Sequence, residues 1–174
     1  MPKATMRDVV VLLPGIMGSV LQRNGKDAWA ISGQAITRAL LSLGDSIAGL
    51  ELGADDPGLD DLGDGVLPTR VLPDAHLVPG FIRIDGYSHL LDMMLSGFDL
   101  AEGAFSEPRP GRIALSRPGN FFQFPYDWRR DNRVAARRLK RLVDLALAEQ
   151  RKRAPDAKVI LLGHGMGGLV SRYY

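Results

Sequence analysis

The sequence predicts an α/β protein with a mostly parallel sheet, and three observations lead to this prediction. The apolar runs Val9–Leu13 and Val159–Leu162 have the length and composition of strands buried on both faces. Between them, residues 134–150 carry apolar side chains at helical spacing. The C-terminal half therefore alternates strand, helix, strand and helix, an order that favours parallel pairing with right-handed crossovers.

The first apolar run leads directly into Pro14-Gly15-Ile16-Met17-Gly18-Ser19. A strand that ends in a proline and two glycines leaves backbone N–H groups outside any ladder. Such groups can be directed at a developing oxyanion, or they can simply belong to a tight turn. The loop alone does not decide between the two interpretations.

The middle of the chain shows weaker organisation. Helical spacing predicts short helices over residues 35–43 and 87–95, and His89 on the second of them is interpreted as an ordinary exposed or core-edge histidine rather than a catalytic one. The run 51–68, rich in Asp, Gly and Pro, predicts an exposed loop. Residues 102–119, rich in Pro, Gly and Arg, are interpreted as a connector.

Order returns at Phe121–Phe124, an aromatic, β-prone run that Pro125 ends. An amphipathic helix is predicted over Val134–Gln150, with its apolar side formed by Ala135, Leu139, Leu142, Val143, Ala146 and Leu147.

A glycine-dense turn, Gly163-His164-Gly165-Met166-Gly167, follows the last strand and opens a helix. This is the frame of a nucleophile elbow, G-x-S-x-G, in which a strained strand-to-helix turn carries the serine. The serine position is occupied by Gly165, which has no side chain to attack a substrate.

The same letters fit a second motif, because Gly163, Gly165 and Gly168 spell the dinucleotide fingerprint G-x-G-x-x-G. Two features disfavour this alternative. The confirming acid would lie about twenty residues further on, beyond Tyr174, and the fingerprint normally belongs to the first βαβ unit rather than the last.

Composition is ordinary for a soluble globular protein, with 45% hydrophobic and 24% charged residues. The sequence has no cysteine, no cleavable apolar segment at residues 1–8, and no apolar run near the roughly eighteen residues that span a bilayer. We therefore expect a cytoplasmic chain, and we predict neither a cofactor nor a metal site.

Charge is unevenly distributed although the net charge is only +2. Seven acids and no bases lie between Arg38 and Arg70, whereas residues 129–153 hold ten of the 22 bases. A solvated helix face is the preferred interpretation of the basic stretch Arg129–Arg153. Attraction to an anionic membrane surface is the alternative, and nucleic acid is disfavoured because no aromatic residues interleave with the bases.

Three segments together resemble the lecithin:cholesterol acyltransferase-like family of α/β-hydrolases. They are Val9–Val20, Asn120–Asp131 with P-Y-D-W-R, and Lys158–Tyr174 with G-H-x-M-G-G-L-V. The resemblance implies the N-terminal part of an α/β-hydrolase fold, with an inserted cap-like or lipid-facing region over residues 21–112. It also implies acyl transfer or hydrolysis of lipid esters, with a lipid or ester as the substrate.

Site residues follow from the same resemblance. The nucleophile position is Gly165, and the oxyanion donors map to the backbone N–H groups of Ile16 or Met17 and of Met166. Asp127 is expected to accept N–H bonds where the long helix begins. The remaining motif positions are Pro14, Gly15, Gly18, Tyr126, Trp128, Arg129, Gly163, His164 and Gly167, with His164 at the variable position of the elbow.

Two departures from the family pattern lower the expected activity. Gly165 replaces the serine, and the seven residues after the elbow contain neither an acid nor a histidine. Ser19 and Ser171 have no histidine placed for them by sequence and are interpreted as structural. We therefore predict a single, incomplete α/β-hydrolase domain over residues 1–174 that is inactive by itself, with a non-catalytic remnant or binding module as the alternative.

Overall fold

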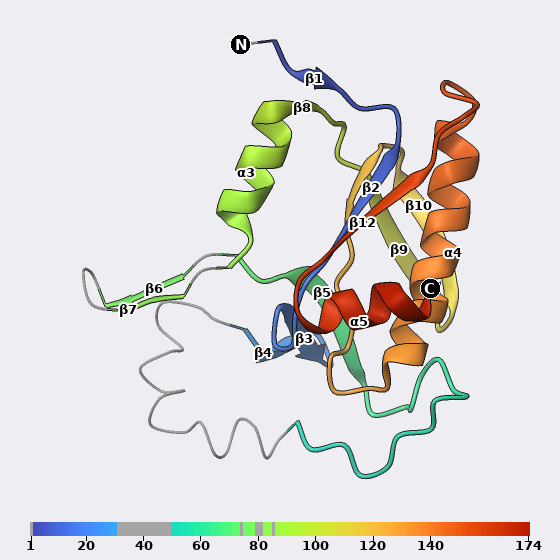
Figure 1. Ribbon diagram of the computed structural model, residues 1–174. Coiled ribbons are helices and arrows are strands. Elements are labelled where there is room, and N and C mark those ends of the chain that lie inside the picture. The colour runs from blue at the N-terminus through green and yellow to red at the C-terminus, as the bar shows by residue number, and fades with distance from the viewer. Residues whose placement is uncertain (1, 31–49, 74, 79–81, 85) are drawn as a thin grey trace.

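The computed structural model describes residues 2–30, 50–73, 75–78, 82–84 and 86–174 (Figure 1). The helix predicted over residues 35–43 lies outside the described residues. In chain order, the elements are β1 (Ala4–Thr5), β2 (Val9–Leu13), β3 (Ser19–Arg23), β4 (Lys26–Trp29), β5 (Val66–Val71), β6 (Ala75–Val78), β7 (Ile82–Ile84), α3 (Ser88–Gly97), β8 (Phe98–Asp99), β9 (Ala104–Arg109), β10 (Arg112–Arg117), β11 (Phe121–Gln123), α4 (Asn132–Gln150), β12 (Val159–Gly163) and α5 (Met166–Tyr173).

The predicted buried strands form one three-stranded parallel sheet in the order β11-β2-β12. All five residues of β2 are buried, as expected for a central strand covered on both faces. The pairing of β2 with β12 sets Leu13 opposite Gly163, so the two strands end side by side. The loops that leave β2 and β12 are therefore neighbours.

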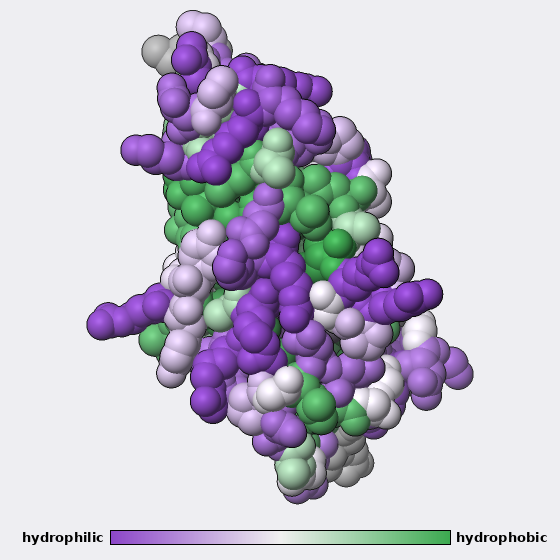
Figure 2. All heavy atoms as spheres, turned by 90° about the vertical axis from the view of Figure 1, so that its right-hand side faces the viewer, coloured by the Kyte–Doolittle hydropathy of each residue, from purple (hydrophilic) through white to green (hydrophobic). Residues whose placement is uncertain are grey.

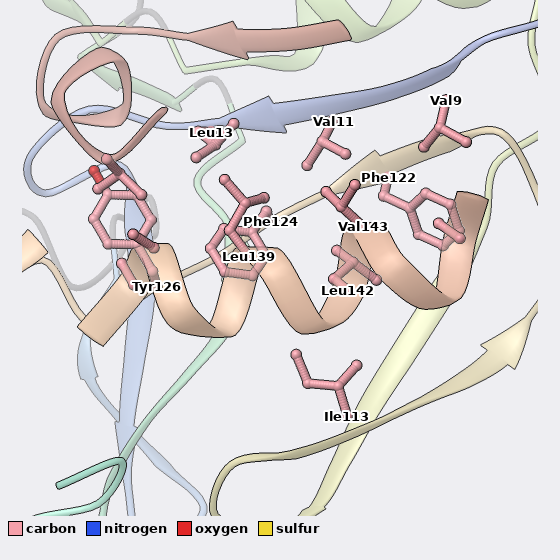
Figure 3. Close-up of a cluster of buried hydrophobic side chains, with 14 residues drawn as sticks. Val9, Val11, Leu13, Ile113, Phe122, Phe124, Tyr126, Leu139, Leu142 and Val143 are labelled. Carbon is pink, nitrogen blue, oxygen red and sulfur yellow. The ribbon is translucent and has the colours of Figure 1, made fainter. Parts of the chain in front are cut away.

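The sheet lies between helices on its two faces (Figure 1). Val9, Val11 and Leu13 point toward α4, where they meet Leu139, Leu142 and Val143 (Figure 3). Val10 and Leu12 pack on the opposite side against side chains of α3 and Phe121. This alternation explains why the sequence of β2 shows no polar position.

The prediction of a mostly parallel sheet holds only in part. The central sheet and the β1–β8 pair are parallel, whereas β4-β3-β5, β6–β7 and β9–β10 are antiparallel. The neighbours β3–β4, β6–β7 and β9–β10 are joined by connections too short for a crossover, and short connections impose antiparallel pairing. The result is a mixed α/β fold with several sheets.

The prediction of a connector over residues 102–119 is wrong, because this segment forms the β9–β10 hairpin. Gly111 adopts φ +73° at its turn, a backbone conformation that favours glycine. Ile113 on β10 faces α4 from the side away from the central sheet (Figure 3). Ile113 and Leu115 repeat at the spacing of a strand, and this was the signal available in the sequence.

The loop expected over residues 51–68 is also shorter than predicted, because Val66–Val71 is strand β5. The remaining acidic loop, residues 51–65, contacts the arginines of the basic stretch through its carboxylates. Arg130 pairs with Asp55 at 2.9 Å, and Arg141 pairs with Asp60 at 2.9 Å. Charges that are segregated in the sequence therefore meet in space, and a purely solvated basic face is not what the structure shows.

Figure 2 views the molecule from the side on which α4 lies in Figure 1. Hydrophilic side chains cover much of this face, and a hydrophobic area lies in its upper half. In the part of the chain that the structure describes, no helix combines the length and apolar character needed to cross a bilayer.

Candidate functional site

The turn between β12 and α5 has the sharp geometry that the elbow frame requires. Gly165 adopts φ 52° and ψ −117°. The N–H of Gly167 donates to the carbonyl oxygen of His164 at 2.8 Å, which makes Gly165 the second residue of a type II′ turn. A side chain at such a backbone conformation would cost about 1–3 kcal/mol.

The three glycines of the elbow serve different purposes. A Cβ atom at Gly163 would lie 2.6 Å from a backbone nitrogen of α5, and one at Gly167 would lie 2.4 Å from the last carbonyl oxygen of β2. Both are therefore required by the close approach of strand and helix. Among the described residues, a Cβ atom at Gly165 would instead have only the Cα of Gly15 nearby, at 3.8 Å, so these residues leave room for a side chain.

The loop after β2 lies against the elbow and forms a turn of its own. The N–H of Gly18 donates to the carbonyl oxygen of Gly15 at 3.0 Å. Met17 has φ 62° at the third position of this turn, a region in which residues with side chains are strained. The indole N–H of Trp29 donates to the carbonyl oxygen of Met17 at 3.0 Å and secures the strained residue.

Three backbone donors at this junction are not engaged. Within the described residues, the N–H groups of Ile16, Met17 and Met166 donate to no protein acceptor. The N–H of Gly15, by contrast, donates to the phenolic oxygen of Tyr87 at 2.7 Å. The side chain of Ile16 is 64% exposed, so the loop that carries two of the three donors faces solvent.

The segment Tyr126–Arg129 joins the loop after β2 to the long helix. The buried hydroxyl of Tyr126 donates to the carbonyl oxygen of Pro14 at 2.8 Å. Its backbone N–H donates to the hydroxyl oxygen of Ser19 at 3.0 Å, and the indole N–H of Trp128 donates to the Ser19 carbonyl at 3.1 Å. Burial is the main cause that raises the pKa of Tyr126 above its ordinary value. These contacts hold the loop in place.

Arg129 connects the same segment to the acidic loop. Its guanidinium lies between Asp127, at 2.6 Å, and Asp64, at 2.8 Å. Burial lowers the pKa of Arg129, but the two carboxylates outweigh this effect and the net shift is upward. Burial also disfavours the charged form of Asp64 and so raises its pKa. The hydrogen bonds from Val66 and Arg129 lower this pKa more, and the net shift is downward.

The expected role of Asp127 at the helix start needs a correction. Its carboxylate accepts from the N–H of Arg129 at 3.1 Å, within the turn before the helix. The N-cap of α4 is Asp131, whose side chain accepts from the N–H of Arg133 at 2.8 Å. Asp127 therefore shapes the preceding turn, and Asp131 satisfies the helix terminus.

A cavity of about 640 Å³ lies away from this junction. It is lined by β5, β9 and the first turns of α4, and neither the elbow nor the loop after β2 contributes to it. In the described residues, no group of three or more histidine, aspartate or glutamate side chains could hold a metal ion. The cavity is therefore separate from the elbow, although Tyr126 and Asp127 line it.

Comparison with known families matches one segment of the chain. Residues 113–174 match the family model of lecithin:cholesterol acyltransferase. This part of the chain is similar to that family. The matched segment includes the P-Y-D-W-R motif and the elbow, whereas the loop after β2 lies outside it. The resemblance predicted from the sequence is confirmed over these residues. No curated protein and no solved structure matches the chain significantly.

Sequence reasoning missed two side chains of the site, Tyr87 and Trp29. Both come from the segment 21–112 between the family motifs, and a lone aromatic residue in that segment carries no signal of its own. His89 is exposed on α3, as expected. Ser19 is fully buried in β3, and its hydroxyl oxygen accepts from the N–H of Tyr126.

The other candidate nucleophile is also engaged in structure. The hydroxyl of Ser171 donates to the carbonyl oxygen of Gly167 at 2.8 Å, one turn earlier in α5. This is the back-bonding that serine commonly makes in helices. Both serines have the structural roles that the sequence favoured.

Proposed function

We propose that this chain is a domain of the lipid acyltransferase and lipase type that binds an acyl ester at the elbow but does not cleave it. The observation that carries the proposal is the backbone of Gly165, which has the conformation of the nucleophile residue of an elbow and open space where its side chain would stand. The reactive oxygen is absent. What remains is a site shaped around an ester carbonyl.

The unengaged N–H groups support a carbonyl ligand. Ile16 and Met17 present them from the loop after β2, and Met166 presents one from the residue after the elbow position. One donor from each of these two places is the arrangement of an oxyanion hole in this fold. In the absence of a nucleophile, these donors can hold the ester oxygen in its ground state.

The packing of the glycines weighs against the dinucleotide alternative. In the dinucleotide fingerprint the third glycine allows close packing of helix on strand. Here a Cβ atom at Gly168 would meet no described residue outside its own helix turn nearer than 3.8 Å, whereas one at Gly167 would clash with the backbone of β2. The tight positions are those of the elbow frame.

An anionic membrane surface is not assigned to the stretch Arg129–Arg153. Ion pairs with acidic side chains already occupy most of its bases, and the hydrogen bond from Arg151 to the carbonyl of Ala157 occupies another. The lipid specificity proposed here therefore rests on the elbow alone.

The experiment is a titration of the ¹⁵N-labelled chain with 4-nitrophenyl butyrate, a soluble acyl ester, monitored by amide NMR. We expect saturable shifts at Ile16, Met17 and Met166, and release of nitrophenolate no faster than in buffer. A parallel titration with NAD serves as the control for the nucleotide alternative. Shifts with NAD but not with the ester would overturn the binding proposal, and ester cleavage above the buffer rate would overturn the proposed inactivity.

A further inference from the structure

Tyr87 links the two halves of the site through one hydroxyl group. Its oxygen accepts from the N–H of Gly15 at 2.7 Å and lies 2.8 Å from Nδ1 of His164. The three residues come from the loop after β2, the start of α3 and the elbow, and are separated by more than seventy positions in sequence. A single side chain therefore fixes the spacing between elbow and loop.

The backbone of Tyr87 is held to the same loop. Its N–H donates to the carbonyl oxygen of Leu72 at 3.2 Å, and the N–H of Leu72 donates to the carbonyl oxygen of Gly18 at 2.9 Å. A Cβ atom at Gly18 would lie 3.1 Å from the Tyr87 hydroxyl, and one at Gly15 would lie 3.1 Å from Nδ1 of His164. These contacts form a closed ring without room for a side chain at either glycine.

The direction of the two hydrogen bonds at the Tyr87 hydroxyl follows from which groups can donate. Gly15 can only donate, so the Tyr87 oxygen accepts from it. The described residues offer the Tyr87 hydroxyl hydrogen no acceptor other than Nδ1 of His164. A hydrogen bond from this hydroxyl to Nδ1 requires the tautomer of the neutral imidazole that carries its hydrogen on Nε2.

Tyr87 is suited to this role and unsuited to nucleophilic attack. The side chain is buried, and burial is the main cause that raises its pKa, although the hydrogen bond from Gly15 opposes the shift. The hydroxyl therefore keeps its hydrogen at neutral pH. A buried, protonated phenol can orient its neighbours but is a poor nucleophile.

We propose that Tyr87 is a positioning residue that engages the N–H of Gly15 and fixes the tautomer of His164, so that an acyl ligand meets only the N–H groups of Ile16, Met17 and Met166. This inference rests on the proposed function for the identity of the ligand. The arrangement itself belongs to the ligand-free protein. The segment between the family motifs thereby contributes a residue to the site.

The test compares Tyr87→Phe with Tyr126→Phe, a matched control that removes another buried hydroxyl bonded to the same loop. Nitrogen-15 NMR of the His164 ring reports the tautomer, and amide exchange reports the hydrogen bond of Gly15. In the unaltered protein we expect hydrogen on Nε2. Tyr87→Phe should give a mixture of tautomers and exchange at Gly15 faster by roughly two- to tenfold, the equivalent of one typical hydrogen bond.

The control variant should leave the tautomer unchanged. Hydrogen on Nδ1 of His164 in the unaltered protein would overturn the inference without any variant, even where Tyr87→Phe does not fold. An unchanged ring and unchanged exchange in a folded Tyr87→Phe protein would overturn it as well, as would an equal change in Tyr126→Phe. These readouts need no ligand, so failure of the ester titration leaves them interpretable. A weaker ester affinity in Tyr87→Phe then connects the two proposals.

Discussion

A Cβ atom at Gly165 would lie 3.8 Å from the Cα of Gly15, an ordinary van der Waals contact, and no other atom of the described residues outside its chain neighbours is as near. The junction of elbow and loop therefore accepts a side chain at this position without rearrangement. The backbone is what opposes one, because φ is 52°. The space around the Cβ atom and the strain of the backbone therefore contribute separately to the stability of variants with a side chain at Gly165, and each contribution can be measured.

Gly165→Ser and Gly165→Ala should both destabilise the protein, by about 1–3 kcal/mol, and by similar amounts. The reason is that both add a Cβ atom to a left-handed backbone while the surroundings stay open. Urea unfolding at neutral pH measures the difference. A midpoint that stays level or rises for both variants would be incompatible with the elbow conformation.

Gly163→Ala and Gly167→Ala provide the contrast. Their Cβ atoms would meet backbone atoms at 2.6 and 2.4 Å, so strand and helix must separate. We expect both variants to lose more stability than Gly165→Ala in the same urea experiment. If Gly167→Ala were the milder substitution, the assigned roles of the glycines would be reversed.

Ser19→Ala should destabilise the protein by about 1–3 kcal/mol. The substitution leaves the buried N–H of Tyr126 without its acceptor, and an unsatisfied buried donor costs its full desolvation. Ser19→Thr retains an acceptor oxygen and is the matched variant, although its extra methyl group enters a fully buried position. A loss for Ser19→Ala well under 1 kcal/mol would show that the N–H of Tyr126 finds another partner.

Asp131 should make stability sensitive to acid. The hydrogen bond from the side chain of Arg133 is the main cause that lowers the pKa of Asp131 to about 2 from an ordinary value of 3.8. A carboxylate with a depressed folded-state pKa stabilises the fold above about pH 4 and loses that contribution as the pH falls toward 2.

Asp131→Asn retains a cap acceptor but cannot titrate, whereas Asp131→Ala loses the cap. At pH 7 the urea midpoint should fall further for alanine than for asparagine. Between pH 4 and 2 the midpoint of Asp131→Asn should vary less than that of the unaltered protein. Parallel pH profiles for the two would rule out the titration of Asp131 as a source of acid sensitivity.

Arg130 should hold the acidic loop onto the turn before α4. The guanidinium is buried, pairs with Asp55 at 2.9 Å, and donates to the carbonyl oxygens of Asp56, Leu59 and Asp60. Arg130→Met removes these bonds and should cost about 2–4 kcal/mol, with faster protease cleavage within residues 55–64.

The exposed pair of Arg133 and Asp131 supplies the control for this experiment. Arg133→Ala should change cleavage of the loop little, because exposed ion pairs contribute little to stability. Equal cleavage rates in the two variants would show that the loop is held by other contacts.

Much of the central sheet could be predicted because its signals are local. The apolar runs of β2 and β12, the helical spacing of α4 and the glycines of the elbow each lie within one short segment. The hairpin β9–β10 was missed because Pro108, Pro110 and Gly111, residue types that usually mark loops, interrupt it. Only Ile113 and Leu115 show the alternation of apolar residues that is expected of a strand.

The part of the site that escaped prediction depends on contacts between distant segments. Tyr87 reaches Gly15 across 72 positions and His164 across 77. No spacing rule connects such residues, since the fold alone brings them together. The pairing of Asp55 with Arg130 was hidden for the same reason, although the complementary charges of the two segments were visible in the sequence.

The ion pairs of the acidic loop with α4 and with the turn before it also imply an order of assembly. During synthesis, Asp55 and Asp64 leave the ribosome before the arginines with which they pair, because their partners lie 65 to 75 residues further along the chain. Until α4 has formed, this loop has neither its counter-ions nor the guanidinium that gathers its carbonyl groups. The loop is therefore among the last parts of the chain to become fixed, and the nascent protein carries a stretch of unpaired negative charge until it does.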